Sequence, residues 1–489
     1  MHLRLGLDAT ISSKRCRERD LVIGMIAERL IHPCSKLATT RMWHTTTLAE
    51  ELDVGDADED DLYGAMDWLV KRQDLIEKKL SERHLSDGAL VLYDVSSSYY
   101  EGRHCELAQF GHNRDRKKGT LSIVYGVLTD YDGGPVGVEV YSGDTGDPST
   151  LMDQVDKLRE RFGLKRVVMV GDRGLLTQTQ IDKLKENPGL GFITALRSHS
   201  IRALVENGSL QMSLFDEKNL CEISSPDYPG ERLVACYNPL MAEERRRKRL
   251  DLIEATEREL LKIKREVLRR RATPLNKVEI AKKVGKVINR HKVEKHFNLS
   301  IEDGTFEFGR DEEAIRREAM LDGVYVIRTS EPAERLPAED VVRRYKGLAR
   351  VERAFICLKS VDILIRPIFH RDPDRVRAHI FICMLAYYVE WRMRSALAPI
   401  LFEDEELERA WKKRDPVLPA KPSDSVKFKK ASHLTDDGLP VQSFKTLLAE
   451  LATQCKNRCR IKTDPTASTF NQITTPTPIQ KKTFELLEL

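Results

Sequence analysis

Between residues 89 and 196 the chain holds five short apolar segments, and their alternation with turns and amphipathic stretches restricts this region to the α/β class. The expected strands are Ala89–Val95, Thr120–Thr129, Pro135–Tyr141, Lys165–Gly171 and Gly191–Leu196. Turn residues 130–134 join the second and third strands into a hairpin. Helices are expected from Asp147, as an N-cap before Pro148, to about Phe162, and over Gln178–Glu186. The order β-β-β-α-β-α-β makes the first and fourth strands neighbours.

Helical patterns surround this region. Residues 1–85 are expected to be helical, with helices over Asp20–His32 and Asp61–Leu85. Residues 201–325 interrupt the alternation as an insertion, and Val324–Arg328 is a further strand. Two helices, Glu339–Ser360 and Asp374–Ala396, precede a polar, proline-rich tail that we expect to be loosely packed, with one helix near Phe444–Thr453. The predicted domains are therefore 1–85, 86–200, 201–325, 326–400 and 401–489.

Composition excludes several classes of protein. An apolar content of 41% excludes a wholly disordered chain. The 81 basic and 77 acidic residues leave a formal net charge of only +4, so any nucleic-acid site must come from a local cluster. No apolar run is long enough to span a bilayer, and nine scattered cysteines fit a reducing cytoplasm. The chain has no Gly-x4-Gly-Lys-Ser/Thr loop, so ATP hydrolysis is not supported.

Two aspartates follow buried strands. Asp94 lies at the end of the first strand, and Asp172 comes directly after the fourth. Because these strands are expected neighbours, both carboxylates should lie at one edge of the sheet. The alternative is that each only caps the turn that follows it.

A third acid comes from the helix over Glu339–Ser360. Helical spacing places Tyr345, Leu348, Glu352 and Lys359 on one stripe, whereas Val351, Phe355 and Leu358 would face the core. The alternative is an ordinary solvated stripe in which Glu352 pairs with Lys359 or Arg350. Other acids near this position are Glu339, Asp340 and Asp362.

Three carboxylates from two strands and a helix suit phosphodiester chemistry. Displacement at a phosphodiester requires charge neutralisation at both the attacking and the leaving oxygen. Two Mg²⁺ ions about 3.5–4 Å apart supply it, and such hard cations prefer carboxylate oxygens. Mn²⁺, which also prefers carboxylate ligands, is the expected substitute for Mg²⁺ in such a site.

These residues resemble those of the DDE transposases of bacterial insertion sequences. The resemblance covers roughly residues 18–395. Its motifs are Tyr93-Asp94-Val-Ser-Ser, Gly126-Val-Leu-Thr-Asp, Ser142-Gly-Asp-Thr-Gly-Asp-Pro-Ser-Thr-Leu151, Gly171-Asp172-Arg-Gly and Tyr345-Lys-Gly-Leu-Ala-Arg-Val-Glu-Arg-Ala-Phe355. The family signature around the third acid spaces a tyrosine, an arginine, a glutamate and a lysine. Tyr345, Glu352 and Lys359 match it, but Leu348 occupies the arginine position, so the role of that arginine is not transferred.

The resemblance implies a ribonuclease-H-like core: a mixed sheet flanked by helices, an N-terminal helical region, and a subdomain inserted between the fifth strand and the helix of the third acid. It implies that Asp94, Asp172 and Glu352 are the catalytic, metal-binding residues. Tyr345 and Lys359 would contact transposon-end DNA, with Arg350 as a further candidate. Relatives often carry an additional N-terminal segment, so a shortened N-terminus is expected here.

A basic stretch lies within the predicted insertion. Between Glu243 and Lys295 there are 19 basic and 9 acidic residues. Ile253, Leu260, Ile263 and Val267 recur at roughly heptad spacing, which predicts a helix packed on a partner helix. The DNA-binding candidates here are Arg245, Arg246, Arg247, Lys248, Arg249, Arg269, Arg270 and Arg271. The alternative is a solvated charged helix. His291 and His296, in the same stretch, are expected at the surface.

The predicted function is an insertion-sequence transposase that cuts transposon ends and joins the 3′-hydroxyl to target DNA. It would act as a homodimer on double-stranded DNA, in the cytoplasm and associated with the nucleoid. One alternative is a catalytically inactive or truncated transposase-derived protein that only binds DNA. A ribonuclease-H-like repair nuclease, which would cleave without joining, is the other.

Overall fold

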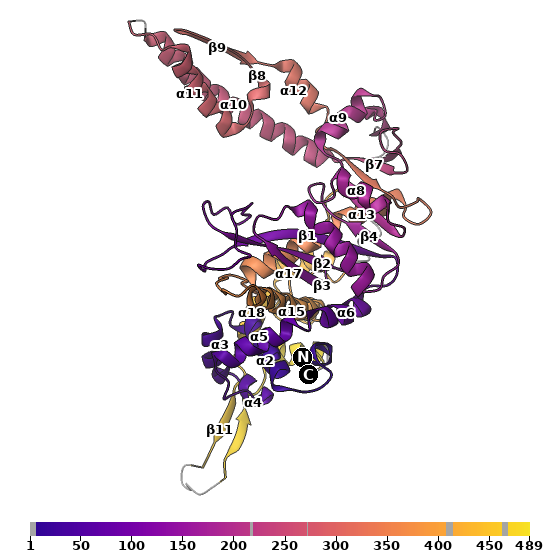
Figure 1. The fold of residues 1–489 in the computed structure, drawn as a ribbon, viewed down its shortest axis with the longest axis vertical. Helices are drawn as coiled ribbons and strands as arrows, with labels where there is room; N and C mark the ends of the chain where they lie inside the picture. The colour runs from indigo at the N-terminus through magenta and orange to yellow at the C-terminus, as the bar shows by residue number, and fades with distance from the viewer. Residues whose placement is uncertain (1–5, 216–218, 271, 407–413, 462–467) are drawn as a thin grey trace. The chain divides into compact units, whose positions relative to one another are not determined.

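The computed structural model describes residues 6–215, 219–270, 272–406, 414–461 and 468–489. The chain divides into two compact units, and each is described by itself (Figure 1). The first comprises Met1–Thr194, Arg343–Arg414 and Ala420–Leu489, and the second Ala195–Val342 with Asp415–Pro419. The first unit is thus assembled from segments on both sides of the second in sequence.

The first unit contains a mixed sheet. Its strands are β1 (Ala89–Tyr99), β2 (Ser122–Thr129), β3 (Pro135–Ser142), β4 (Val167–Val170) and β5 (Leu190–Ala195). They lie in the order β3-β2-β1-β4-β5. The first three are antiparallel, whereas β4 is parallel to β1 and β5 to β4. The mixed sheet flanked by helices that the sequence predicts is confirmed.

One face of this sheet packs against α7 (Leu151–Asp156), a π-helical turn over Lys157–Arg161, and α8 (Gln178–Lys185). The shared core holds Tyr93 and Val95 from β1 and Leu151 from α7. The prediction that Asp147 caps this helix is wrong, because its carboxylate pairs with Arg114 and Gly146 occupies the N-cap position without a side-chain bond. A charge-assisted bond to a guanidinium is stronger than one to a backbone N–H, so the ion pair is favoured.

Helices from distant parts of the chain cover the other face. α14 (Leu348–Ile356) packs on β1, and α15 (Pro373–Leu397) and α6 (Gln73–His84) pack on β3. α15 also contacts α2 (Arg17–Ile31) and α5 (Glu59–Val70), on its side away from the sheet (Figure 1). The single helix predicted over Asp61–Leu85 is therefore wrong: it is two, α5 and α6, so that the chain can contact both α15 and β3. The short helices α1 (Leu7–Ile11), α3 (Lys36–Met42) and α4 (Leu48–Leu52) complete the N-terminal region.

The helix predicted over Glu339–Ser360 is also divided. α13 (Ala338–Lys346) ends before Gly347, α14 begins at Leu348, and a π-helical turn over Cys357–Val361 follows. A Cβ atom at Gly347 would lie 2.8 Å from a ring carbon of Tyr131. The break therefore falls where a close approach to an aromatic ring requires glycine.

The second unit has two cores of its own. One lies beneath β7 (Arg232–Tyr237), which pairs with β6 (Leu220–Ile223) and β10 (Val324–Thr329), and beside α9 (Ser198–Glu206). The other joins α10 (Pro239–Arg269) and α11 (Lys277–His291) to a hairpin of β8 (Phe297–Glu302) and β9 (Thr305–Arg310), with α12 (Glu312–Ala319) following.

Two predictions fall on this second core. Ile253, Leu260, Ile263 and Val267 of α10 are buried in it, and α10 packs on α11, so the prediction of a partner helix is confirmed. The surface prediction for His296 is wrong. This residue is buried, and its Nε2 lies 2.5 Å from a carboxylate oxygen of Glu318, which compensates for its removal from water.

Residues beyond 401 pack better than their composition predicts. They form α17 (Asp424–Ser432), α18 (Phe444–Leu451), α19 (Pro478–Leu486) and a hairpin of β11 (Lys456–Cys459) and β12 (Phe470–Ile473). The expectation of loose packing is wrong, because Phe444, Leu447 and Ile479 share a buried cluster with Leu397 and Ile400. A few apolar residues are enough to form this buried cluster, because all of them pack against the C-terminal end of α15. No helix in the described part of the chain is both long and apolar enough to cross a membrane.

Candidate active site

Strand register sets the positions of the first two acids. Leu92 of β1 pairs with Val170 of β4 in a parallel register. Asp94 and Asp172 each stand two residues beyond that pair, so they lie at the same level of neighbouring segments. The expectation that Asp94 ends its strand is wrong, because β1 continues to Tyr99 through its pairing with β2. The prediction that the first and fourth strands are neighbours is confirmed.

Asp94 lies in a half-buried position facing away from the Tyr93 and Val95 side of the sheet. One of its carboxylate oxygens accepts the N–H of Val95 at 2.8 Å. Burial raises the pKa of Asp94 to about 6; the nearby charge of Asp172 adds to this, and Arg114 opposes it. The two carboxylates are therefore close enough to interact, and no cation pairs with either among the described residues.

Asp172 is exposed and caps its own turn. Its Oδ1 accepts the N–H groups of Gly174 at 2.9 Å and Leu175 at 2.7 Å. The alternative in which Asp172 only caps its turn therefore accounts for Oδ1 but not for the second carboxylate oxygen, Oδ2. In the described chain, Oδ2 has no hydrogen bond and is left for another ligand.

Glu352 is held outward by the packing of α14. Val351, Phe355 and Leu358 are buried as predicted, and the ring of Phe355 lies 5.9 Å from that of Tyr125 on β2. Glu352 itself is exposed.

The pairing alternative for Glu352 is wrong, because both proposed partners are engaged elsewhere. Lys359 donates to the carbonyl of Ser97 and lies 3.3 Å from Asp115. Arg350 bonds to Asp132 at 2.9 Å. Across the described ranges, Glu352 makes no hydrogen bond or ion pair.

The phenol of Tyr345 lies near both Asp172 and Glu352. Burial raises the pKa of Tyr345 to about 12, and the neighbouring charges of Asp172 and Glu352 both contribute to this rise, whereas Arg173 opposes it. The phenol therefore lies near both carboxylates and stays protonated at neutral pH, as a hydrogen-bond donor. The charge of Asp172 thus acts on Asp94, and the charges of Asp172 and Glu352 both act on Tyr345, although the three acids do not form a group whose oxygens all lie within 4.8 Å of one another among the described residues.

The alternative third acids are on segments other than α14. Asp362 belongs to a separate cluster with Cys357 and Glu390. Glu339 and Asp340 are in the first turn of α13.

The donor set fits hard divalent cations. All three candidates offer carboxylate oxygens, which Mg²⁺ and Mn²⁺ prefer. A partly buried carboxylate beside a second one, without a paired lysine or arginine, is costly unless a cation joins them. Asp94 and Asp172 meet that description.

Sequence reasoning missed residues in the loop between β1 and β2. Arg114 pairs with Asp147, and its charge reaches Asp94. Asp115 accepts the N–H of Tyr99 at 3.0 Å and pairs with Lys359. The signal was the charged run from Arg114 to Lys118, which follows the strand that carries Asp94.

The predicted DNA-binding residues of the second unit differ in exposure. Arg245, Arg246, Arg247 and Lys248 are exposed on α10, and so are Arg269 and Arg270 near its end. Arg249 is buried in a bidentate pair with Asp322. Arg271 lies outside the described residues.

A family model described as the transposase DDE domain matches residues 88–389, which include the whole candidate site. The chain belongs to the DDE transposase family. The match spans β1, β4 and α14, the three elements that carry or precede the acids of the DDE domain. Nuclease and transposition activity is the chemistry of this family.

Two solved structures are similar to the DDE transposase chain. One is "Cryo-EM structure of piggyBac transposase synaptic complex with hairpin DNA (SNHP)", with 12% identity over 88% of this chain and 86% of that one, at a TM-score of 0.36. The other is "Mos1 transposase paired-end complex with left transposon end", with 12% identity over 35% of this chain and 61% of that one, at a TM-score of 0.16. A comparison with curated proteins found no match. The family assignment rests on residues 88–389.

Proposed function

We propose that the chain is an insertion-sequence transposase that cuts transposon ends and joins the freed 3′-hydroxyl to target DNA. Within the matched DDE domain, the charge of Asp172 acts on Asp94, and those of Asp172 and Glu352 act on Tyr345. The observation that carries this proposal is that none of these three acids is paired to a lysine or arginine of the described chain. A structural role for three such acids would favour ion pairs. Because no such ion pairs form in the described chain, the three carboxylates are available to bind metal ions.

Asp94, Asp172 and Glu352 would hold two Mg²⁺ ions, for which Mn²⁺ can substitute. When bound, these ions would neutralise charge on the attacking and leaving oxygens of the phosphodiester. The protein itself would orient the carboxylates through the β1–β4 register and the packing of α14. Tyr345 would donate a hydrogen bond to the DNA phosphate, because its phenol remains protonated near Asp172 and Glu352.

Cationic side chains near the acids would bind the DNA backbone. Arg114 is close enough to Asp94 to lower its pKa, although it already pairs with Asp147. Lys359 is tied to Ser97 and Asp115, so its first role is to position the β1–β2 loop beside the acids. Arg350 lies over the Tyr131 ring at 4.5 Å and remains a candidate contact for DNA.

Exposed basic residues of α10 would supply a separate DNA surface. Arg245, Arg246, Arg247 and Lys248, with Arg269 and Arg270, make up the exposed part of the proposed set, from which the buried Arg249 is omitted. Arg271 is a further candidate from the sequence alone, outside the described residues. Phosphate contacts release counterions, so binding through this set should weaken steeply with salt. Holding two transposon ends together calls for two catalytic cores, and we propose a homodimer on DNA, in the cytoplasm at the nucleoid.

The proposal is tested with purified protein and duplexes that carry the inverted repeats flanking its reading frame. In Mg²⁺ or Mn²⁺, the wild type should nick the ends and join them to a target plasmid. The variants Asp94→Asn, Asp172→Asn and Glu352→Gln should each lose at least about a thousandfold in cleavage while binding persists, because each removes a charged metal ligand. Glu186→Gln, which changes an exposed acid at the end of α8, is the matched control and should cleave normally.

Other outcomes separate the alternatives. Binding without cleavage by the wild type would indicate an inactive, transposase-derived DNA-binding protein. Cleavage without strand joining would indicate a nuclease. Full activity in the Glu352→Gln variant would remove this residue from the site.

A further inference from the structure

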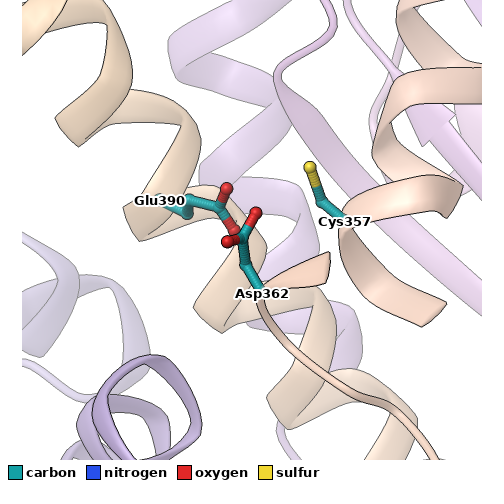
Figure 2. A group of neighbouring side chains, drawn as sticks. All are labelled: Cys357, Asp362 and Glu390. Carbon is teal, nitrogen blue, oxygen red and sulfur yellow. The ribbon is translucent and has the colours of Figure 1, made fainter. Parts of the chain in front are cut away.

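A second cluster of potential metal ligands lies apart from the three acids. Cys357 is on the π-helical turn after α14, Asp362 follows that turn, and Glu390 is on α15. One donor atom from each lies within 4.8 Å of the others. Figure 2 shows the carboxyl groups of Asp362 and Glu390 directed toward one another, with the thiol of Cys357 beside them.

This cluster contains an unsatisfied buried oxygen. Glu390 is 0% exposed and Cys357 5%. Oε1 of Glu390 accepts a hydrogen bond from Arg394 at 2.6 Å, but Oε2 has no partner in the described part of the chain. Burial raises the pKa of Glu390 to about 7, and a hydrogen bond with Asp362 contributes, so at neutral pH this oxygen requires either a proton shared with Asp362 or a bound cation.

When Asp362 and Glu390 are both ionised, Arg394 balances only one of the two charges. Besides Glu390, it bonds to Asp362 at 2.9 Å and Glu403 at 3.1 Å. Glu403 has a second partner in Arg353, which leaves Arg394 to serve Asp362 and Glu390. When a metal displaces the thiol proton, the three donors carry three negative charges, and a divalent cation with Arg394 supplies three positive ones.

We propose that Cys357, Asp362 and Glu390 bind one Zn²⁺ ion at a site separate from the catalytic acids. A thiolate ligand selects Zn²⁺ over Mg²⁺, which takes oxygen ligands. Asp362 also lines a cavity of about 1310 Å³, together with Leu364 and His32. That cavity reaches Asp362 but is not lined by Cys357 or Glu390, so the ion and a water molecule as fourth ligand would enter on the Asp362 side.

The ion would connect the segment after the Glu352 helix to α15. Cys357 and Asp362 belong to that segment, and Glu390 lies in the middle of the helix that supports the sheet. Zinc would therefore stabilise the fold and hold α14 in place. This role does not depend on transposition activity.

The test uses the full chain carrying Asp94→Asn, Asp172→Asn and Glu352→Gln, so that only the second cluster can bind metal. After removal of metal with a chelator, Co²⁺ is titrated in as a spectroscopic probe for zinc. We expect one equivalent to produce a thiolate-to-cobalt charge-transfer band, and Zn²⁺ to displace it. Added Cys357→Ser should abolish the band, and Glu390→Gln should weaken Co²⁺ binding at least about tenfold.

Cys383→Ser is the matched control, because Cys383 is another buried cysteine on α15, and it should keep the band. Zn²⁺ should also raise the thermal midpoint of the control but not that of the Cys357→Ser protein. Asp362→Asn and Glu390→Gln preserve side-chain shape and give the same comparison if Cys357→Ser fails to fold. Absence of a cobalt–thiolate band in the parent, or its persistence in Cys357→Ser, would overturn the proposal.

Discussion

Glu28 lies on α2 with both carboxylate oxygens buried and without a hydrogen-bond partner in the described chain. Among the described residues, the basic side chain within 4.0 Å of this carboxyl is His32, whose Nδ1 is 3.8 Å away. Burial alone raises the pKa of Glu28 to about 7. A neutral carboxyl is therefore compatible with this position, whereas an ionised one is destabilising there.

The first prediction concerns the pH dependence that Glu28 imposes on stability. Its folded-state pKa of about 7 lies above its ordinary value of 4.5, so the favourable contribution is fully present below about pH 4.5 and is lost as pH rises through about 7. The loss should be on the order of 3 kcal/mol. Glu28→Gln removes this titration, so its stability relative to the wild type should increase between pH 5 and pH 8. Urea unfolding of both proteins across that range measures the difference, and a constant difference would contradict the assignment.

Arg114 provides a second prediction at this scale. Arg114→Gln removes a positive charge near Asp94, where phosphate is proposed to bind, so end cleavage should fall at least about tenfold. Lys118→Ala removes an exposed charge from the same loop and serves as the control, with an expected change of less than about twofold. Steady-state cleavage at fixed salt measures the activity of both variants. Equal losses of cleavage would mean that the net charge of the loop, and not the position of Arg114 beside Asp94, determines activity.

Among the elements, β2 depends on one glycine. A Cβ atom at Gly126 would lie 2.2 Å from the hydroxyl of Tyr93, which donates to Thr150 at 2.9 Å. Tyr93 immediately precedes Asp94 on β1. The close packing of a strand against this tyrosine therefore supports the position of the first acid.

The third prediction compares two glycines. Gly126→Ala should lower stability by about 1–3 kcal/mol, because Tyr93 must move or β2 must shift. Gly64→Ala lies within α5, where an added Cβ meets nothing within 4 Å, and should instead raise stability by up to about 1 kcal/mol. Thermal unfolding of both variants tests the pair, and a stabilising Gly126→Ala would show that Tyr93 is free to rearrange.

Elements with strong local signals could be predicted from sequence, and those set by distant contacts could not. The apolar run before Asp94 predicted β1, and helical spacing placed Val351 and Phe355 in the core. The break at Gly347 depends on the ring of Tyr131, far away in the chain. Cys357 and Glu390 meet only because α15 packs beside the π-helical turn, so no spacing pattern could join them.

At the scale of the whole molecule, the C-terminal segment closes the first unit. Phe444, Leu447 and Ile479 bury the end of α15 together with Leu397. Sequence composition could not predict this, because the apolar residues are few and separated by polar, proline-rich stretches. These apolar residues stabilise the first unit only because all of them pack against the C-terminal end of α15.

The fourth prediction tests that closure. Leu447→Ala should cost about 2–5 kcal/mol, because a fully buried side chain is truncated. Leu434→Ala changes a leucine of the same segment that is 42% exposed, and should alter stability by less than about 0.5 kcal/mol. Chemical denaturation of both proteins measures the two effects. Equal, small losses would mean that the segment detaches readily from α15.

The second unit separates Asp172 from Glu352 along the chain, and this separation has a consequence during protein synthesis. A ribosome that has added Asp172 must add about 180 more residues before it reaches Glu352. At about 5–20 residues per second, this takes roughly 10 to 40 s. On the proposed assignment, a nascent or prematurely terminated polypeptide lacks its third carboxylate throughout that interval. On that assignment, an unfinished chain could not assemble the three-carboxylate site.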